Sequence, residues 1–531
     1  MTDQIPYGLG MEGRELYVPA LSLNVYKQTA GWDRFQTIKP IDYLPENFTV
    51  LGNLKLTLPE TIPADYKPNV SVINNQKDDW YLQYGSLTVN GDGVLSMKDF
   101  SMLWDPNYQY DYYDRSQNYC TLVNNSHLRA DNVFIDVYTR NDRWTFLTLP
   151  FDVKVGDIEM LCNGTTNWVI RRYDGQKRAA GETADTWVRM NADDMMNAGE
   201  GYIIQGSRYV GNDWQAYSGF RMKAVNNGNK NNIFRADDIT VTLADYESEF
   251  AHNRSWNLIG NPYPCYYDTR FMQYDAPITV WSTRNNTYTA YSPADDDYIL
   301  LPGEAFFVQR PVENGTVLFG KDGRQINRTV RNIELSRGDK AGTLRTIVNL
   351  TLSDGSHSDR TRVVLNEQAS LQYEMDKDAG KFMSTDATVP QIFTSFNGVD
   401  YAINERPMAE GTVDISLRIG ADGLYTIALG NAVENCQVVL EDRAENRQVV
   451  LSAEGEYVFS AKAGSCAGRF VLRFTNEATG IGTWQSDNSS QADKQVYNLQ
   501  GQRINSNFSI RNSQLSKGVY IQNGKKIMLN K

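Results

Sequence analysis

The chain has 531 residues, of which 41% are hydrophobic and 11% aromatic, and its formal net charge is −12. This length and apolar content are enough for several domains with buried cores. The acidic balance argues against nucleic acid as a general partner, because phosphate binding needs a basic surface. No stretch approaches the roughly 20 consecutive apolar residues of a membrane-spanning helix. The first residues lack the pattern of a signal peptide, so the chain is either cytoplasmic or a form whose export signal has been removed.

Alternating runs rich in Val, Ile, Thr, Tyr and Phe recur along the chain, and long helical periodicity is almost absent. This pattern predicts an all-β, multidomain protein. Residues 1–130 form an irregular β region, with short strands expected at 47–57, 81–87, 93–103 and 121–128. This region could be the end of a longer array of strands, such as a β-solenoid.

One fragment of this region, Asn90-Gly91-Asp92-Gly93 with Asp99 six residues after Gly93, is similar to part of a calcium loop. A loop of the EF-hand type would place an acid two residues before Asn90, where this chain has Thr88. Its flanks are typical of strands rather than helices. We therefore favour a hairpin with a glycine-rich turn over a calcium site.

Residues 131–320 contain an internal repeat. The sequence WTFLTLPF at 144–151 matches WNLIGNPY at 256–263, and GEGYIIQ at 199–205 matches GEAFFVQ at 303–309. Each half also has an aromatic strand in its middle, at 168–173 and at 278–281. The repeat predicts a duplicated β module whose halves bury their Trp and aromatic residues against each other. A single helical turn is predicted at 193–197.

Residues 321–476 show evenly spaced alternating runs, which predict a β-sandwich of two packed antiparallel sheets. Strands at 344–352 and 361–365 flank a turn-rich segment. The polar residues 477–494 have the composition of a linker. In the final segment, 495–531, strands are expected at 496–499, 518–522 and 526–529. Asn523-Gly524 supplies the positive φ angles of a tight hairpin between the last two strands.

The final segment resembles the C-terminal sorting domain that Bacteroidetes use for type IX secretion. The matching residues are VYNLQGQR at 496–503, KGVYI at 517–521 and GKK at 524–526. The resemblance implies a small β-sandwich that an outer-membrane export apparatus recognises and usually removes as its cargo is released or anchored. It implies a protein that is secreted or held at the outer cell surface, with the type IX secretion machinery as a partner.

The Trp–Pro–aromatic module, the Gly-Glu–aromatic strand and the segment DKDAGK at 376–381 are similar, more loosely, to the β regions that precede such sorting domains. Those regions are non-catalytic. The resemblance therefore implies no active site that could be transferred to this chain.

Five cysteines are spread along the chain, and none forms a C-x-x-C pair, which argues against a zinc ribbon or a thioredoxin-type site. Cys436 and Cys466 fall in one predicted domain and could form a disulfide. The alternative is that Cys120, Cys162, Cys265 and these two are separate, mostly buried thiols.

Few residues suggest catalysis. None of the three histidines, His127, His252 and His357, has a second ligand or base at the spacing of a metal site or triad, so surface or turn positions are expected. The acids at 193–194 and the triplet at 295–297 are candidate glycosidase carboxylates, and the triplet is also a candidate calcium site; solvated loop acids are the simpler interpretation. No nucleophile elbow, P-loop or dinucleotide-binding pattern occurs. We therefore predict no catalytic, metal-binding or cofactor-binding residue, and no cofactor.

Tyr108, Tyr110, Tyr112 and Tyr113 lie in a polar stretch, DPNYQYDYYD at 105–114, which suits sugar or protein contact as well as a solvent-facing loop or β-edge. The sequence favours a non-enzymatic, adhesin-like protein of the cell surface, acting in adhesion, glycan contact or as a scaffold. Its partner would be a glycan or a host or cell-surface protein. The alternative is a carbohydrate-active enzyme, a polysaccharide lyase or glycoside hydrolase, with its site in residues 1–320. A protease is the least favoured of these functions, because the sequence contains no nucleophile motif.

Overall fold

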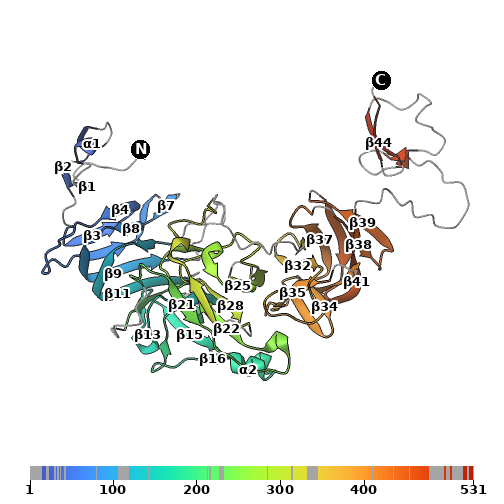
Figure 1. Cartoon of the computed structure of the whole chain (residues 1–531), viewed down its shortest axis with the longest axis horizontal. Coiled ribbons are helices and arrows are strands. Elements are labelled where there is room, and N and C mark those ends of the chain that lie inside the picture. The colour runs from blue at the N-terminus through green and yellow to red at the C-terminus, as the bar shows by residue number, and fades with distance from the viewer. Residues whose placement is uncertain are drawn as a thin grey trace, which may run out of the picture. The chain divides into compact units, whose positions relative to one another are not determined.

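The computed structural model describes most of the chain from residue 44 to 476, with short segments near both ends. The described residues are 15–18, 23–28, 32, 35, 37–40, 44–78, 81–105, 119–141, 143–211, 213–214, 217–225, 233–283, 285–311, 315–331, 345–407, 411–433, 436–453, 455–476, 496–497, 503–504, 518–522 and 525–529. They form two compact units, residues 1–476 and 477–531 (Figure 1). Strands predominate throughout, which confirms the all-β, multidomain class. In the described part of the chain, no helix has the length and apolar character that a membrane crossing requires.

The chain from residue 47 to 140 coils as a solenoid of two parallel sheets, the blue strands of Figure 1. The first sheet stacks β3 (Asn47–Val50), β5 (Asn69–Val72), β9 (Val94–Trp104) and β11 (His127–Arg140), all parallel. The second stacks β4 (Asn53–Thr57), β8 (Ser86–Asn90) and β10 (Thr121–Asn124), also parallel. Because successive strands alternate between the sheets, each coil contacts only its neighbours. The prediction of a strand array in this region is confirmed.

Alternation of residue types holds the coils in register. Val50, Val72, Met102 and Ile135 are aligned across the first sheet and are all buried, so that each coil adds a layer to one apolar core. Facing outward, matching polar side chains bond between coils: the Ser101 hydroxyl donates to the Ser71 hydroxyl at 2.9 Å. A strand slipped by one residue would exchange these two faces, so the pattern fixes the pairing.

The predicted hairpin at residues 90–93 is wrong. β8 and β9 lie in different sheets and do not pair, so this segment is a corner of the solenoid. Gly91 has a φ of 96°, and a Cβ there would lie 2.4 Å from the Leu58 carbonyl oxygen, so the corner requires glycine. Asp99 lies within β9 and accepts a hydrogen bond from Asn132 of the next coil at 2.8 Å. In the described residues, no group of three or more His, Cys, Asp or Glu side chains gathers in a way that could hold a metal ion.

The same strand order occurs twice between residues 127 and 319. The order is β12-β18-β15-β16 in the first half and β22-β28-β25-β26 in the second, and the flanking sheets repeat as β14-β20-β11 and β24-β29-β21. β11 therefore serves both as a coil of the solenoid and as a strand of the first half. The bounds in the first half are β12 (Thr145–Thr148), β13 (Val153–Lys154), β14 (Glu159–Met160), β15 (Thr165–Tyr173), β16 (Trp187–Arg189), β17 (Met195–Met196), β18 (Gly201–Val210), β19 (Asp213–Trp214) and β20 (Tyr217–Lys223). Those in the second half are β21 (Ile239–Thr242), β22 (Trp256–Gly260), β23 (Tyr266–Asp268), β24 (Met272–Gln273), β25 (Ile278–Ser282), β26 (Thr287–Tyr291), β27 (Ile299–Leu300), β28 (Ala305–Gln309), β29 (Thr316–Phe319) and β30 (Arg324–Gln325).

The two halves share an aromatic core that includes Phe146, Trp256, Trp281 and Phe307. Equivalent positions of the two sequences meet there, and small residues allow the approach. A Cβ on Gly260 would lie 2.2 Å from the side chain of Thr148, its counterpart in the other half. Mutual burial of the halves thus follows from the repeated Trp and Gly-Glu motifs.

Residues 345–476 form one curled sheet that folds over a core including Val348, Ile392, Leu417 and Phe470. Its strand order is β39-β38-β41-β36-β34-β35-β32-β31-β37-β40, with β33 paired to β35. The bounds are β31 (Arg345–Ser353), β32 (Ser358–Asn366), β33 (Ala379–Gly380), β34 (Gln391–Phe396), β35 (Val399–Arg406), β36 (Thr412–Ile419), β37 (Gly423–Leu429), β38 (Cys436–Asp442), β39 (Arg447–Leu451), β40 (Glu456–Ala461) and β41 (Gly464–Asn476).

The packing of this region is sandwich-like, as expected, but its hydrogen bonding differs from the prediction of two separate antiparallel sheets. The 13-residue β41 pairs with both β36 and β38, which keeps the ladder continuous. A register shift between Ile415 and Leu417 disturbs the β36–β41 ladder, and such irregularities let a sheet bend over its own core. β32 and β35 are parallel, so the region is not purely antiparallel.

The described remainder consists of short elements. They are β1 (Glu15–Val18), β2 (Thr37–Pro40), β6 (Asn74–Asp78), β7 (Tyr81–Tyr84), α1 (Leu23–Gln28), α2 (Gly175–Ala179) and the 3₁₀ turns η3 (Val155–Asp157), η4 (Thr183–Asp185), η5 (Ala251–Asn253), η6 (Thr269–Phe271) and η7 (Lys321–Gly323). The helical turn expected at 193–197 is instead a bend followed by β17. Asp194 closes this bend by accepting the Asn191 backbone N–H at 2.7 Å.

The C-terminal unit contains β42 (Val496–Tyr497), β43 (Arg503–Ile504), β44 (Gly518–Gln522) and β45 (Lys525–Leu529), in the order β43-β42-β44-β45. β44 and β45 are antiparallel, with Gln522 opposite Lys525 and two residues between them. This pairing confirms the hairpin predicted from Asn523-Gly524. The linker predicted at 477–494 lies outside the described residues, except for its boundary with the first unit.

All five cysteines are free thiols. Cys436 lies opposite Asn476 at one end of the β38–β41 ladder, and Cys466 is ten residues earlier on β41. Ten residues of strand span roughly 30 Å, so a disulfide between the two is excluded.

Candidate functional site

The three histidines do not form a site with one another. His127 is exposed at the start of β11, and His357 lies in the turn before β32, where its Nδ1 is 3.3 Å from Asp354 Oδ2. His252 lies in η5, and its carbonyl oxygen accepts the indole N–H of Trp256 at 2.8 Å. Burial, together with the charge of Arg178, lowers the pKa of His252 below its ordinary value. Their places agree with the expected turn and surface positions.

The acid pair at 193–194 lies in the bend before β17. The exposed Asp193 carboxylate makes a surface ion pair with Lys154 at 3.1 Å, while Asp194 closes the bend. These two contacts stabilise the bend and the surface beside it.

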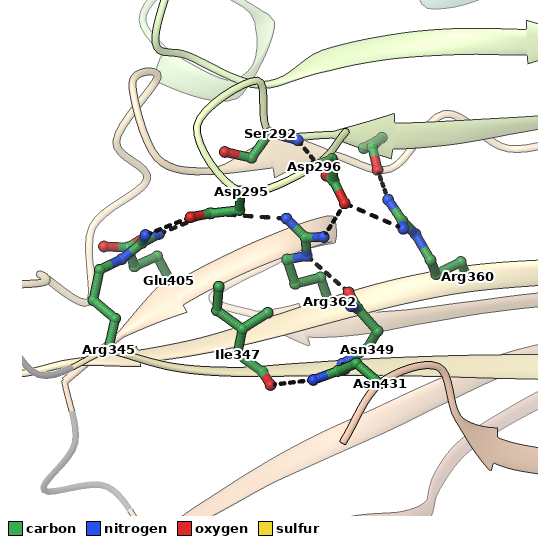
Figure 2. A network of polar contacts seen from close by, with 11 residues as sticks. Ser292, Asp295, Asp296, Arg345, Ile347, Asn349, Arg360, Arg362, Glu405 and Asn431 are labelled. Carbon is green, nitrogen blue, oxygen red and sulfur yellow. Dashed lines mark hydrogen bonds and ion pairs between the residues drawn. The ribbon is translucent and has the colours of Figure 1, made fainter. Parts of the chain in front are cut away.

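Two acids of the triplet at 295–297, Asp295 and Asp296, are 10% and 14% exposed and lie in an ionic junction between the second half of the repeat and the curled sheet (Figure 2). Arg345 donates two hydrogen bonds to the Asp295 carboxylate, at 2.8 and 3.1 Å, and a third to Glu405 at 2.8 Å. Arg362, which is 2% exposed, donates to Asp296 at 2.5 Å. The solvated-loop interpretation is thus wrong for Asp295 and Asp296. It fits Asp297, whose side chain is 59% exposed.

The charged groups of the junction form ion pairs that join two parts of the fold. Burial pushes the pKa of Asp295 upward, but the hydrogen bonds and charge of Arg345 outweigh it and hold that pKa below its ordinary value. The same contacts raise the pKa of Arg345 against the opposing effect of burial. The adjoining space measures about 10 Å³, which is room for a single water molecule. Asp295 is therefore not placed as a general acid, which needs a raised pKa.

The segment 376–381, DKDAGK, supplies two further ties. Lys381 Nζ lies 2.5 Å from Asp359 Oδ2, and both side chains are buried. Asp378 accepts two backbone N–H groups, from Glu374 and Glu405, each at 2.8 Å. Burial is the main reason that the pKa of Asp378 is raised to about 7, with the nearby charges of Glu374 and Glu405 acting in the same direction.

This raised pKa predicts a pH-dependent stability. An unfolded Asp titrates near 4, so between about pH 4 and 7 the folded chain holds one more proton than the unfolded chain. The contribution of Asp378 is therefore fully present below pH 4 and is lost as the pH rises through 7, at up to about 1.4 kcal/mol per unit. The side chain of Asp378→Asn cannot titrate. We therefore expect the free energy of unfolding of this variant to fall further below that of the wild type at pH 5 than at pH 7. Unfolding free energies of the pair at both values measure this, and a constant difference would contradict it.

A second polar group lies where the solenoid meets the second half of the repeat. We call it the tyrosine cluster, and its members are Tyr119, Tyr266, Tyr291, Tyr298, Glu304 and Arg328. The Tyr298 hydroxyl donates to Glu304 Oε1 at 2.8 Å, and the rings of Tyr291 and Tyr298 stack with centroids 4.3 Å apart. The Tyr119 ring meets that of Tyr266 edge-on at 6.1 Å. Tyr266 is fully buried and Arg328 is exposed, while the remaining members are half-buried.

Burial raises the pKa of Glu304, and it does so against the Leu301 backbone N–H, the charge of Arg328 and the Tyr298 hydroxyl. Burial, followed by the charge of Glu304, also holds the pKa of Tyr298 well above its ordinary value. The tyrosine therefore stays protonated at neutral pH and can donate a hydrogen bond. The cluster thus brings aromatic rings, hydroxyl groups, a carboxyl group and a guanidinium together in one half-buried place, where Arg328 lies over the Tyr298 ring at 6.0 Å and Arg360 over the Tyr291 ring at 4.5 Å.

Comparison of the two halves shows which part of this arrangement is structural. Glu200, the counterpart of Glu304, accepts from Asn197 Nδ2 at 3.1 Å and from the Tyr202 hydroxyl at 2.8 Å. Glu304 likewise accepts the backbone N–H of Leu301, three residues earlier, at 2.9 Å. Closing this loop is therefore a role that the Gly-Glu motif has in both halves. In the second half the carboxylate also faces Arg328 and the stacked tyrosine pair.

No protein-family model matches the chain, and a search of curated proteins likewise found no match. Function must therefore be argued from the residues themselves.

One member of the tyrosine cluster, Tyr119, follows the Tyr-rich stretch at 105–114 in the sequence. Tyr108, Tyr110, Tyr112 and Tyr113 lie outside the described residues. The stretch begins at Asp105, directly after β9, and Tyr119 follows it and bridges back to Trp104. Burial is the main reason that the pKa of Tyr119 is raised, and the negative charge of Asp105 acts in the same direction. The sequence did not indicate Tyr266, Tyr298 or Arg328, since they come together only through the pairing of β23 with β27 and β30, which are far apart in sequence. The repeated Gly-Glu motif, which contains Glu304, was the available signal.

Proposed function

We propose that this chain is an exported, non-enzymatic β-protein of the cell surface that contacts glycans. The observation that carries the proposal is the tyrosine cluster. Sugar rings stack on the faces of aromatic side chains while their hydroxyl groups bond to polar groups at the edges. The half-buried Tyr291 and Tyr298 bring aromatic rings together with the polar groups of Glu304 and Arg328 within one site.

The positions of the other candidate acids support a binding role over a catalytic one. Asp295 and Asp296 are paired with arginines, and Asp378 holds two backbone N–H groups. These groups connect parts of the fold that are far apart in sequence. A rigid assembly of this kind is suited to presenting a binding surface.

The C-terminal unit supports export. Its strands and terminal hairpin are compatible with the small β-sandwich of the type IX sorting domain that residues 496–531 resemble. Its basic residues contrast with the acidic remainder of the chain. In this proposal the C-terminal unit targets the protein to the secretion machinery, and residues 1–476 are the cargo.

A glycan array with the full chain tests the binding proposal. We expect retention on at least one plant or host glycan, and a loss of about tenfold in affinity for Tyr298→Ala, because one aromatic contact of this kind contributes more than 1 kcal/mol. Tyr298→Phe keeps the ring and should lose less. Tyr138→Ala, at a half-buried tyrosine on the outer face of β11, is the matched control and should bind as the wild type does. No signal on any glycan would overturn the proposal.

One observation favours the alternative of a carbohydrate-active enzyme. Glu304 has a raised pKa beside Tyr298 and Arg328, as a general acid requires. Incubation of the wild type with any retained polysaccharide, followed by an assay for new reducing or unsaturated ends, separates the two functions. Turnover that Glu304→Gln abolishes would support the enzyme, and binding without turnover supports the proposed function.

A further inference from the structure

The two halves of the repeat differ in one conspicuous place. β18 has ten residues and its counterpart β28 has five, and β15 has nine against the five of β25. The extra residues of β18 pair with β15 on one side and with β19 on the other. They form a hairpin extension, residues 206–214, that the second half of the repeat lacks.

The tip of the hairpin extension carries exposed apolar side chains. Trp214 is 65% exposed, Val210 43% and Tyr209 38%. The rings of Trp214 and Tyr209 meet edge-on, with centroids 5.2 Å apart and planes at 72°. Val210 pairs with Asp213, and Gly211, which follows Val210, has a φ of 65°. Tyr209 and Trp214 are therefore an exposed aromatic pair that lies across the β18–β19 ladder.

These side chains do not contribute to a hydrophobic core. In the described part of the chain, all three lie outside every buried hydrophobic cluster. The second half folds with the same strand order and without the extension, so the module does not depend on it. An exposed aromatic pair outside the core is typical of a contact site.

The surroundings indicate the kind of partner. Arg208 precedes Tyr209 in β18, and its guanidinium is fixed in place, since its Nε donates to the Asn163 carbonyl at 2.9 Å and its Nη1 to the Tyr217 carbonyl at 3.5 Å. Asn163 itself is exposed. Three side chains on a turn are far smaller than the roughly 800 Å² per partner of a stable protein interface. One aromatic face with polar groups at its edge is sufficient for a sugar ring.

We infer that the hairpin extension is a second glycan-contact site, in which a sugar ring stacks on Trp214 beside Tyr209. The inference rests on the proposed function and adds to it a site separate from the tyrosine cluster. Two sites on one rigid chain would hold a polysaccharide at two points and raise its effective affinity above that of either site alone.

Affinity gel electrophoresis of the full chain in xylan, hydroxyethylcellulose, polygalacturonate and mucin tests this site. We expect at least one polymer to retard the wild type, and Trp214→Ala to weaken that retardation about tenfold. Trp214→Phe should restore part of it. Val210→Ala, which removes exposed apolar surface from the same turn but no ring, is the matched control and should run as the wild type does. Because Trp214 is exposed, none of these changes should alter the thermal unfolding of the chain.

The outcomes separate this inference from the proposed function. If Tyr298→Ala weakens retardation and Trp214→Ala does not, the second site is overturned and the proposed function stands. If no polymer retards the wild type, the proposed function fails and the second site fails with it. If Trp214→Ala leaves retardation unchanged but abolishes self-association in size-exclusion chromatography, the extension is a protein contact and the inference is wrong.

Discussion

Replacing Lys381 with methionine is expected to destabilise the curled sheet by about 3–5 kcal/mol, because the change leaves a buried carboxylate without its counter-charge. Lys381 Nζ is 2.5 Å from Asp359 Oδ2, and the two side chains are 1% and 0% exposed. Asp359 also accepts the Ile392 backbone N–H at 2.7 Å, so its displacement would disturb β34 as well as β32. Hydrogen exchange of peptides from these two strands, measured by mass spectrometry, gives the local free energy of unfolding.

Lys377→Met is the matched control for this experiment. Lys377 lies in the same segment and pairs with Glu374 at 2.9 Å, but these side chains are 22% and 28% exposed. Solvent screening limits such a pair to about 1 kcal/mol or less. If the two variants were destabilised equally, burial of the Lys381–Asp359 pair would not be what makes it important.

Deleting residues 496–531 is expected to abolish delivery to the cell surface in the native host while leaving the remaining chain folded. Residues 1–476 are a compact unit with their own hydrophobic cores, so the deletion removes nothing on which that unit depends. Surface proteolysis and fractionation of whole cells measure delivery, and circular dichroism of the purified truncated chain checks its fold.

A chain that lacks only residues 480–490, within the polar segment, controls for shortening. It keeps the whole C-terminal unit and should reach the surface in normal amounts. If the chain lacking 496–531 also reached the surface in normal amounts, the sorting role proposed for that unit would be wrong.

Local chemistry was sufficient to predict several features of this fold. Asn523-Gly524 predicted the β44–β45 hairpin because that dipeptide favours the positive φ angles of a two-residue turn. Alternation of apolar and polar residues predicted the strands of the solenoid, since only one face of each strand is buried. The matching Trp and Gly-Glu motifs predicted a repeat, because equivalent halves bury equivalent faces.

Strand partners were predicted less well, because alternation specifies which face is buried but not which neighbour is paired. The glycine-rich segment at 90–93 suits a hairpin as well as a corner, and only stacking against the next coil selects the corner. The same ambiguity applies to β41, whose length lets it join what was predicted as two separate sheets.

The sequence by itself determined the all-β class, the internal repeat and the separate character of the C-terminal segment, since each depends on residues that are near one another or that recur. The tertiary structure alone decided the roles of the charged and aromatic groups. Asp296 meets Arg362 across 66 residues, and Tyr119 meets Tyr266 across 147. The chain folds back to make these contacts, and the partners that an acid such as Asp295 or Glu304 meets there then determine whether it is a structural ion pair or a candidate site.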